Sequence, residues 1–134
     1  MADGQGGLYM VPLTLSSEAA TPGPTVGLRL VVSEPTGQVF GEGELTQAAG
    51  GGAGFGIRRI TGTIISTGMG PNISLVALQG EYIVPAGSAR TVQLDAAINI
   101  AMVVDAQWNG CASFTYGTRG ENSCPRAEVE SQQS

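Results

Sequence analysis

The chain has 134 residues, a net charge of −5 and only 13% charged residues, and its sequence contains neither histidine nor lysine. The lack of these two residue types excludes a Ser-His-Asp triad, a Cys-His pair, a Ser-Lys dyad, a Schiff base and the phosphate-binding P-loop. The six basic residues are arginines scattered along the chain, so we expect no nucleic-acid partner. A chain of this length fits one domain with its own core.

The first residues, MADGQGG, carry no positive charge and no long apolar run of the kind found in export signals. No stretch approaches the roughly 18 consecutive apolar residues of a membrane-spanning helix. We therefore expect a cytoplasmic protein without a membrane span. An export signal trimmed from the chain would leave the same sequence, and this alternative stays open.

Alternation of apolar with other residues, the period of a β-strand, recurs along most of the chain. It predicts strands over residues 7–15, 26–33, 38–47, 58–67, 73–84, 91–104 and 112–116. Pro12 lacks the N–H that a central strand needs, so we expect an edge or a bulge in the first strand. Gly80 predicts a bulge or a close backbone approach in the fifth.

The second and third of these segments are joined by a turn with proline at its second position and glycine at its fourth, Pro35 and Gly37. This pattern is typical of a type I turn and predicts an antiparallel hairpin. If the turn closes directly, Arg29 lies opposite Glu42; a bulge at Gly37 would shift the register by one residue. The sequence leaves both registers open.

The longest predicted strand, residues 91–104, has an apolar residue at every second position from 92 to 104. These residues are Val92, Leu94, Ala96, Ile98, Ile100, Met102 and Val104. We expect this row to close a dry core or to line a pocket. The other face of the strand carries Asn99 between Ala97 and Ala101, a nearly uncharged strip on which flat association of two copies would occur.

No segment shows a helical period, and the predicted strands are joined by short links, among them the glycine-rich stretch 48–56. We therefore predict an all-β fold: a single antiparallel β-sandwich or β-barrel of about seven to eight strands. The all-β domain would cover residues 1–117, and residues 118–134 would form a polar C-terminal tail. An Asn-Gly step at Asn109 and Gly110 predicts a tight hairpin before the last strand.

Two motifs carry a resemblance to a known family. Pro35-Thr36-Gly37, followed by Gly43-Glu44-Leu45-Thr46-Gln47-Ala48 at the end of the next strand, is similar to a family of small bacterial proteins catalogued only as a domain of unknown function. These motifs belong to a similar stretch over residues 21–48; a weaker similarity covers residues 99–116, and the two stretches together span about a third of the chain. The resemblance implies a bacterial origin and an all-β domain, and it brings no activity or site residue.

Glu42 and Glu44 fall on one face of a predicted strand, roughly 6.5 to 7 Å apart along it. That spacing would suit a glycosidase pair or, with hard oxygen ligands, a calcium ion. With one Trp, three Tyr and three Phe in the chain, an aromatic-lined cleft is not expected. A solvated strand face, paired with Arg29, is the preferred interpretation, so we expect no enzyme, no metal and no cofactor.

Two aromatic residues near the end of the chain are candidates for contact with a partner or ligand, as is Asn99. Trp108, in a turn, is a binding-site aromatic or a cap on the core, and the cap is preferred. Tyr116 shares a strand face with Phe114.

Cys111 and Cys124 enclose twelve residues, so they form either a disulfide or two free thiols. With no histidine to complete a ligand set, zinc is not expected.

Low charge, abundant small residues on the strands and the absence of lysine lead to one main functional hypothesis. The protein is a non-enzymatic structural or interaction protein that self-associates into a homo-oligomer or larger assembly, through sheet edges or a flat sheet face. The alternative is a small-ligand-binding β-barrel for an apolar molecule or a sugar, in which the inward row of residues 91–104 lines a cavity.

Overall fold

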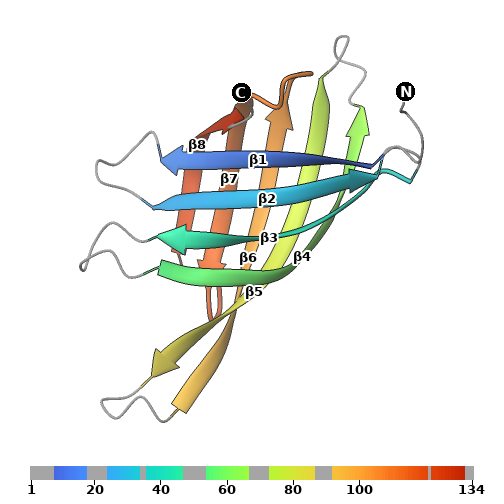
Figure 1. The fold of residues 1–134 in the computed structure, drawn as a ribbon. Helices are drawn as coiled ribbons and strands as arrows, with labels where there is room; N and C mark the ends of the chain where they lie inside the picture. The colour runs from blue at the N-terminus through green and yellow to red at the C-terminus, as the bar shows by residue number, and fades with distance from the viewer. Residues whose placement is uncertain are drawn as a thin grey trace.

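A computed structural model describes residues 8–17, 24–33, 36–46, 54–66, 73–86, 92–120 and 122–131 of the chain. Within these residues the fold consists of eight antiparallel strands, as predicted for an all-β protein (Figure 1). The strands are β1 (Leu8–Ser17), β2 (Thr25–Ser33), β3 (Gln38–Thr46), β4 (Gly54–Ser66), β5 (Ser74–Ala86), β6 (Val92–Val104), β7 (Gly110–Gly117) and β8 (Asn122–Ser131).

The eight strands form a closed barrel in which each strand pairs with its neighbours in sequence and β8 pairs with β1. Of the two predicted architectures, the barrel is therefore the one adopted. In Figure 1 β1 to β4 cross in front of β6 to β8 at a steep angle. Closure removes edge strands from the ring itself, so among the described strands an edge is left only where one strand runs past its neighbour.

The core fills the barrel with side chains from all eight strands. In β6 the predicted alternation is confirmed from Ala96 to Val104, where every second side chain is buried. Leu94 departs from it, with 43% of its surface exposed. No polar or charged residue among those described is buried, so the interior is uniformly apolar.

The C-terminal segment is a strand and not the predicted polar tail. β8 places Cys124, Ala127 and Val129 in the core and pairs with both β7 and β1. Its charged residues lie on the outer face. The inward positions are unequally spaced, because the register with β7 shifts between Ala112 and Phe114, where β8 has one extra residue between Cys124 and Ala127. This spacing hid the strand from the sequence pattern. The predicted boundary at residue 117 is therefore wrong, since the barrel closes only with β8.

β4 departs from the predicted strand pattern at its first residue and at a bulge in its middle. β4 begins at Gly54, inside the stretch predicted as a flexible link, of which residues 48–53 lie outside the described part. The β4–β5 register shifts between Arg58 and Thr61, and Arg59 adopts a positive φ of 57°. Gly80, opposite this bulge, is in the predicted close approach: a Cβ atom there would come within 2.6 Å of Ile57.

The β2–β3 hairpin adopts the register in which Arg29 lies opposite Glu42. Gly37 takes a positive φ of 70°, and its N–H donates to the carbonyl of Ser33 over 2.8 Å. The first two residues of the predicted turn lie outside the described part of the chain. Gly37 therefore ends the turn without shifting the register, and the direct closure is confirmed.

Glycines in the middle of β3 let the sheet bend sharply. A Cβ atom at Gly43 would overlap the carbonyl oxygen of Gly27 on β2, and one at Gly41 would overlap that of Arg29. Both positions face inward, where a side chain would force the two strands apart. The glycine-spaced strand noted in the sequence is thus a requirement of barrel curvature.

Pro12 lies in β1 just before the ladder with β8, which begins at Leu13. Its missing N–H therefore falls outside that ladder, in keeping with the predicted edge position. No helix in the described residues is long and apolar enough to cross a membrane.

Candidate interaction surface

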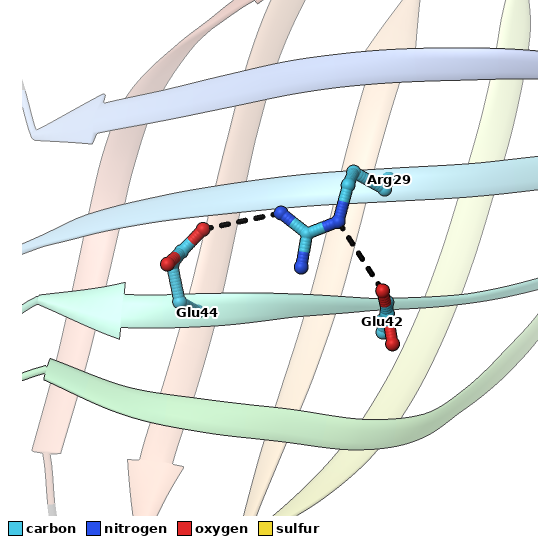
Figure 2. A network of polar contacts seen from close by, with 3 residues as sticks. All are labelled: Arg29, Glu42 and Glu44. Atoms are coloured by element: carbon cyan, nitrogen blue, oxygen red, sulfur yellow. Dashed lines mark hydrogen bonds and ion pairs between the residues drawn. The ribbon is translucent and has the colours of Figure 1, made fainter.

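Glu42 and Glu44 lie on the outer face of β3, where both contact Arg29 of β2 (Figure 2). Arg29 Nε is 3.4 Å from Glu42 Oε2, and Arg29 Nη1 is 3.2 Å from Glu44 Oε1. These hydrogen bonds, with Glu44 the larger contributor, raise the pKa of Arg29. All three side chains are about half exposed or more, so the arrangement is a solvated charged cluster.

The described residues contain no group of three or more Asp, Glu, Cys or His side chains able to hold a metal ion. The two carboxylates of β3 flank one guanidinium, which offsets the charge that a cation would need. The cluster therefore has the geometry of a cross-strand ion pair on a strand surface, and such exposed pairs contribute little to stability.

Trp108 closes one end of the core, as the preferred interpretation had it, and is only 6% exposed. Its ring meets that of Tyr9 edge to face, with centroids 6.5 Å apart. The turn that carries it is built by Asp105, whose carboxylate Oδ1 accepts from the backbone N–H groups of Gln107 and Asn109. Trp108 itself has a positive φ of 67°.

The predicted hairpin is present between β6 and β7, but Asn109 and Gly110 do not form its turn, because Gly110 already pairs with Val104. The turn lies at residues 105–108, where the N–H of Trp108 donates to the carbonyl of Asp105. A Cβ atom at Gly110 would overlap the carbonyl oxygen of Val103, which explains the glycine. The Asn109 side chain instead accepts a hydrogen bond of 3.0 Å from the backbone N–H of Ser131, tying the turn to the end of β8.

Tyr116 faces the core, so it is not an exposed ligand contact. Its ring lies 5.8 Å from that of Phe114, and burial, with a smaller contribution from the Cys124 thiol, raises the pKa of Tyr116.

Cys111 and Cys124 are free thiols on opposite faces of the barrel wall, Cys111 exposed and Cys124 buried. In the β7–β8 ladder Cys111 pairs with Glu128, whereas Cys124 pairs with Phe114. The two cysteines are therefore about three residues apart along the strands, or roughly 10 Å. A disulfide requires Cα atoms within about 7 Å and converging side chains, so of the two alternatives the structure has the free thiols.

Asn99 lies at the centre of the outer surface formed by β4 to β8, which we call the β4–β8 face. Strand register aligns its side chains in three rows, all exposed. The polar row is Thr61, Gln79, Asn99, Thr115 and Ser123. The small row is Thr63, Ala77, Ala101 and Ser113, and the apolar row is Ile65, Leu75, Val103 and Cys111.

The small row forms the floor of a groove between the other two rows. A hollow of about 640 Å³ lies over the polar and small rows, and a second of about 310 Å³ lies over the small and apolar rows. The two hollows share Ala101, Ser113 and Pro125, so they are continuous. On the apolar row the side chains of Ile65, Leu75 and Val103 are 58%, 37% and 42% exposed.

None of the residues in the three rows carries a formal charge. Charged residues begin only at the border of the β4–β8 face, with Arg58 and Glu81 beyond the polar row and with Arg126 and Glu128 on β8. The sequence predicted Asn99 and Ala101 on this face. It could not predict Thr61, Gln79, Thr115 or Ser123, because their alignment depends on four strand registers.

A separate hollow, of about 470 Å³, lies next to the β4–β8 face. Arg58 and Arg59 line it together with Glu81 of β5 and Asp95 of β6. The β4 bulge turns both arginines outward, and Arg59 Nη1 lies 3.9 Å from Glu81 Oε1. Charges of both signs thus share this region, and the side chains of its ion pair are more than half exposed.

The chain was compared with known proteins. A family model described as "Domain of unknown function (DUF1842)" matches residues 6–122, which is most of the chain. The match ends at the first residue of β8, although β8 completes the barrel. No curated protein matches the chain.

Proposed function

The chain belongs to the DUF1842 family, whose description states no activity, and we propose from its own geometry that it is a non-enzymatic interaction protein that self-associates through the β4–β8 face. The observation that carries the proposal is a continuous grooved surface, uncharged apart from Arg126 at its β8 border, with a row of exposed apolar side chains beside it. Exposed apolar surface with a polar rim is typical of protein–protein contacts.

Charge favours another copy of the chain as the partner at this face. Two molecules of net charge −5 repel each other, and the repulsion is smallest where charged side chains are absent. The centres of protein interfaces are depleted in charged residues, as the three rows of the β4–β8 face are. Two copies therefore approach at this face with the lowest electrostatic cost.

The β4–β8 face is also complementary to itself. Consider a two-fold axis that lies in the interface, crosses the strands and passes between the small row and the apolar row. The apolar row of each copy then lies over the small row of the other, with Val103 above the partner's Ala101 and Leu75 above the partner's Ala77. Large side chains enter a groove floored by small ones, which is how isologous interfaces and packed sheets achieve close contact.

The size of the β4–β8 face sets the expected strength of association. Five strands about 4.8 Å apart and three rows about 7 Å apart cover roughly 500 Å² per copy. Stable complexes bury about 800 Å² per partner, and smaller contacts are weak or transient. We therefore expect a dimer with a dissociation constant in the micromolar range.

The alternative, a ligand held inside the barrel, has less support. Ile98 and Ile100, predicted to line such a cavity, are buried among other large apolar side chains of the core. Most residues that line the hollows described above are exposed on the barrel wall, although a few buried residues, such as Ile100 and Phe114, also contribute.

Light scattering after size-exclusion chromatography, over a range of micromolar concentrations, tests the proposal. The expected result is a weight-average mass that rises with concentration from the 13.6 kDa of one chain toward at least twice that value. A stable protein that stays at the mass of one chain throughout the range would overturn the proposal.

A further inference from the structure

β5 and β6 extend beyond the barrel as a two-stranded ribbon, visible at the bottom of Figure 1. Their ladder continues from Ile83 paired with Asp95 to Ala86 paired with Val92. In the described residues, the last β5 residue paired with β4 is Glu81, and the first β6 residue paired with β7 is Ala97. Among the described strands, the ribbon therefore has a neighbour on neither side.

The neighbouring strands leave the ribbon at identifiable points. β4 turns away at its bulge, where Arg59 has a φ of 57°, and β7 ends at Gly117, where φ is 125°. The next described residues, 118–120, form a bend rather than a strand. Each side of the ribbon thus continues a strand position that β4 or β7 has vacated, and an added strand would prolong the barrel sheet there.

Of the two sides, the one formed by β6 is better suited to accept a strand. β5 carries Pro85 in its projecting part, and proline has no N–H to donate. The segment Val92–Ala96 of β6 contains no proline. Pro85 is paired with Gln93 and has no N–H to donate, so this pair fits a non-hydrogen-bonded position of the β5–β6 ladder. At such a position the backbone N–H and C=O groups of Gln93 point away from β5. Because the pattern repeats every second residue, those of Asp95 point the same way.

We propose that this outer side of β6, residues Val92–Ala96, pairs with the same segment of a second copy, antiparallel and across a two-fold axis centred on Leu94. The contact adds to the self-association proposed above, and it rests on that proposal only for the assembly that the two contacts build together. An antiparallel strand is complementary to its own copy, so no partner of different sequence is needed.

The length of the unpaired segment determines the register. With Leu94 on the axis, Val92 of one copy lies opposite the partner's Ala96, the last residue before β7 begins to pair. Any shift along the strand would bring one copy against β7 of the other or leave unpaired residues on both. In this register Gln93 lies opposite the partner's Asp95, and these are the residues whose backbone groups point outward.

Charge and hydrophobicity agree with that register. Asp95 is the one charged residue of the segment, and it faces the partner's Gln93 rather than another carboxylate. Leu94, which is 43% exposed although Ala96 on the same face of the strand is buried, meets its own copy on the axis. The exposed leucine, unexplained by the barrel core, is thereby covered.

The two contacts lie at opposite ends of the described strands. The two-fold axis of the β4–β8 face passes between Ala101 and Val103, whereas that of the ribbon passes through Leu94. Two different two-fold contacts on one molecule join copies into an open chain instead of a closed dimer. The combined prediction is an assembly that grows past the dimer as concentration rises.

Light scattering of the full chain and its variants tests the ribbon contact. Leu94→Lys places a charge on the axis, and Asp95→Pro removes an outward N–H. Both variants are expected to plateau at the dimer mass, whereas wild type and the control Thr46→Lys, a change at an exposed β3 position, grow beyond it. Leu94→Lys changes a half-exposed side chain, so it remains informative if Asp95→Pro does not fold.

The outcomes separate this inference from the proposed function. A wild-type mass that stops at a dimer which Leu94→Lys leaves intact, or growth beyond the dimer that Leu94→Lys leaves unchanged, overturns the ribbon contact. If Leu94→Lys instead abolishes all association while Ala101→Glu on the β4–β8 face has no effect, the ribbon contact stands and the proposed function is wrong. Hydrogen exchange gives a second readout: the backbone amides of Gln93 and Asp95 should exchange more slowly as concentration increases.

Discussion

Ala101→Glu is the substitution that most selectively removes the proposed contact between β4–β8 faces. Ala101 lies on the floor of the groove, where it would receive Val103 of the partner. A glutamate there fills the groove and sets a carboxylate against an apolar side chain, a burial that is unfavourable without a partner charge. By symmetry the dimer suffers the change twice.

The size of the effect follows from the exposure of Val103. Its 42% exposed surface corresponds to roughly 65 Å², and covering that area is worth about 1.6 kcal/mol at 25 cal/mol per Å². Losing the contact at both symmetric positions costs about 3 kcal/mol, which weakens dimerisation roughly 200-fold. The desolvation of the carboxylate adds to this figure.

Sedimentation equilibrium would measure the dissociation constants of wild type, Ala101→Glu, Ala101→Ser and Thr46→Glu. Ala101→Ser keeps the groove open, and Thr46→Glu adds the same charge at an exposed position of β3, so both should associate like wild type. Because Ala101 is exposed in the single chain, Ala101→Glu should retain the melting temperature of the monomer. Unchanged association of Ala101→Glu would refute the reasoning.

Three further predictions concern the barrel itself. Gly43→Ala should lower the melting temperature by about 5 to 10 °C, because overpacking costs about 2 kcal/mol of stability. The control Gly56→Ala, which has no atom within 4 Å of the added Cβ, should leave the melting temperature unchanged. Equal shifts for the two variants would contradict the account of the bend. In native protein a thiol reagent should modify Cys111 quickly and reach Cys124 only after unfolding, and two protected thiols or a disulfide would disprove the assignment. Burial raises the pKa of Tyr116, so its contribution to stability should be fully present below the unfolded pKa near 10 and be lost as pH rises through the folded pKa. In urea titrations at alkaline pH, the Tyr116→Phe variant should therefore lose less stability than wild type. Parallel stability curves for the two proteins would contradict this.

Strand positions were predictable from the sequence because alternation records which side chains meet the core. Residues 91–104 were read correctly as a strand with Ile98 and Ile100 facing inward. The Pro35–Gly37 turn likewise predicted the β2–β3 hairpin. Choosing between its registers required the backbone, because a positive φ at Gly37 is compatible with a direct closure or a bulge.

β8 escaped prediction because its alternation is interrupted. Cys124, Ala127 and Val129 face inward at unequal spacing, and the intervening residues are a proline and two charged residues. A strand that closes a barrel is recognised by the two neighbours it joins, which a local pattern does not contain. The same limitation left the state of the two cysteines open, because a short separation in sequence does not show which face of the barrel wall each thiol occupies.

The β4–β8 face shows the corresponding limit for function. The alternation within a single strand predicted that small, uncharged residues such as Asn99 and Ala101 face outward. The groove arises only when Ala77, Ala101 and Ser113 align across three strands, with larger side chains on the next row. That alignment depends on strand register, so the sequence could indicate a bland surface but not its shape.

Chemical cross-linking at Val103 tests the central claim most directly. In a Cys111→Ser background, the variants V103C and T46C each present a single exposed thiol, with Cys124 buried in both. Across the proposed two-fold axis the Cα atoms of the two copies of residue 103 are about one row and one sheet spacing apart, roughly 12 Å, within reach of a short bismaleimide. The account predicts rapid formation of a covalent dimer for V103C and little for T46C; equal, slow cross-linking of both would contradict it.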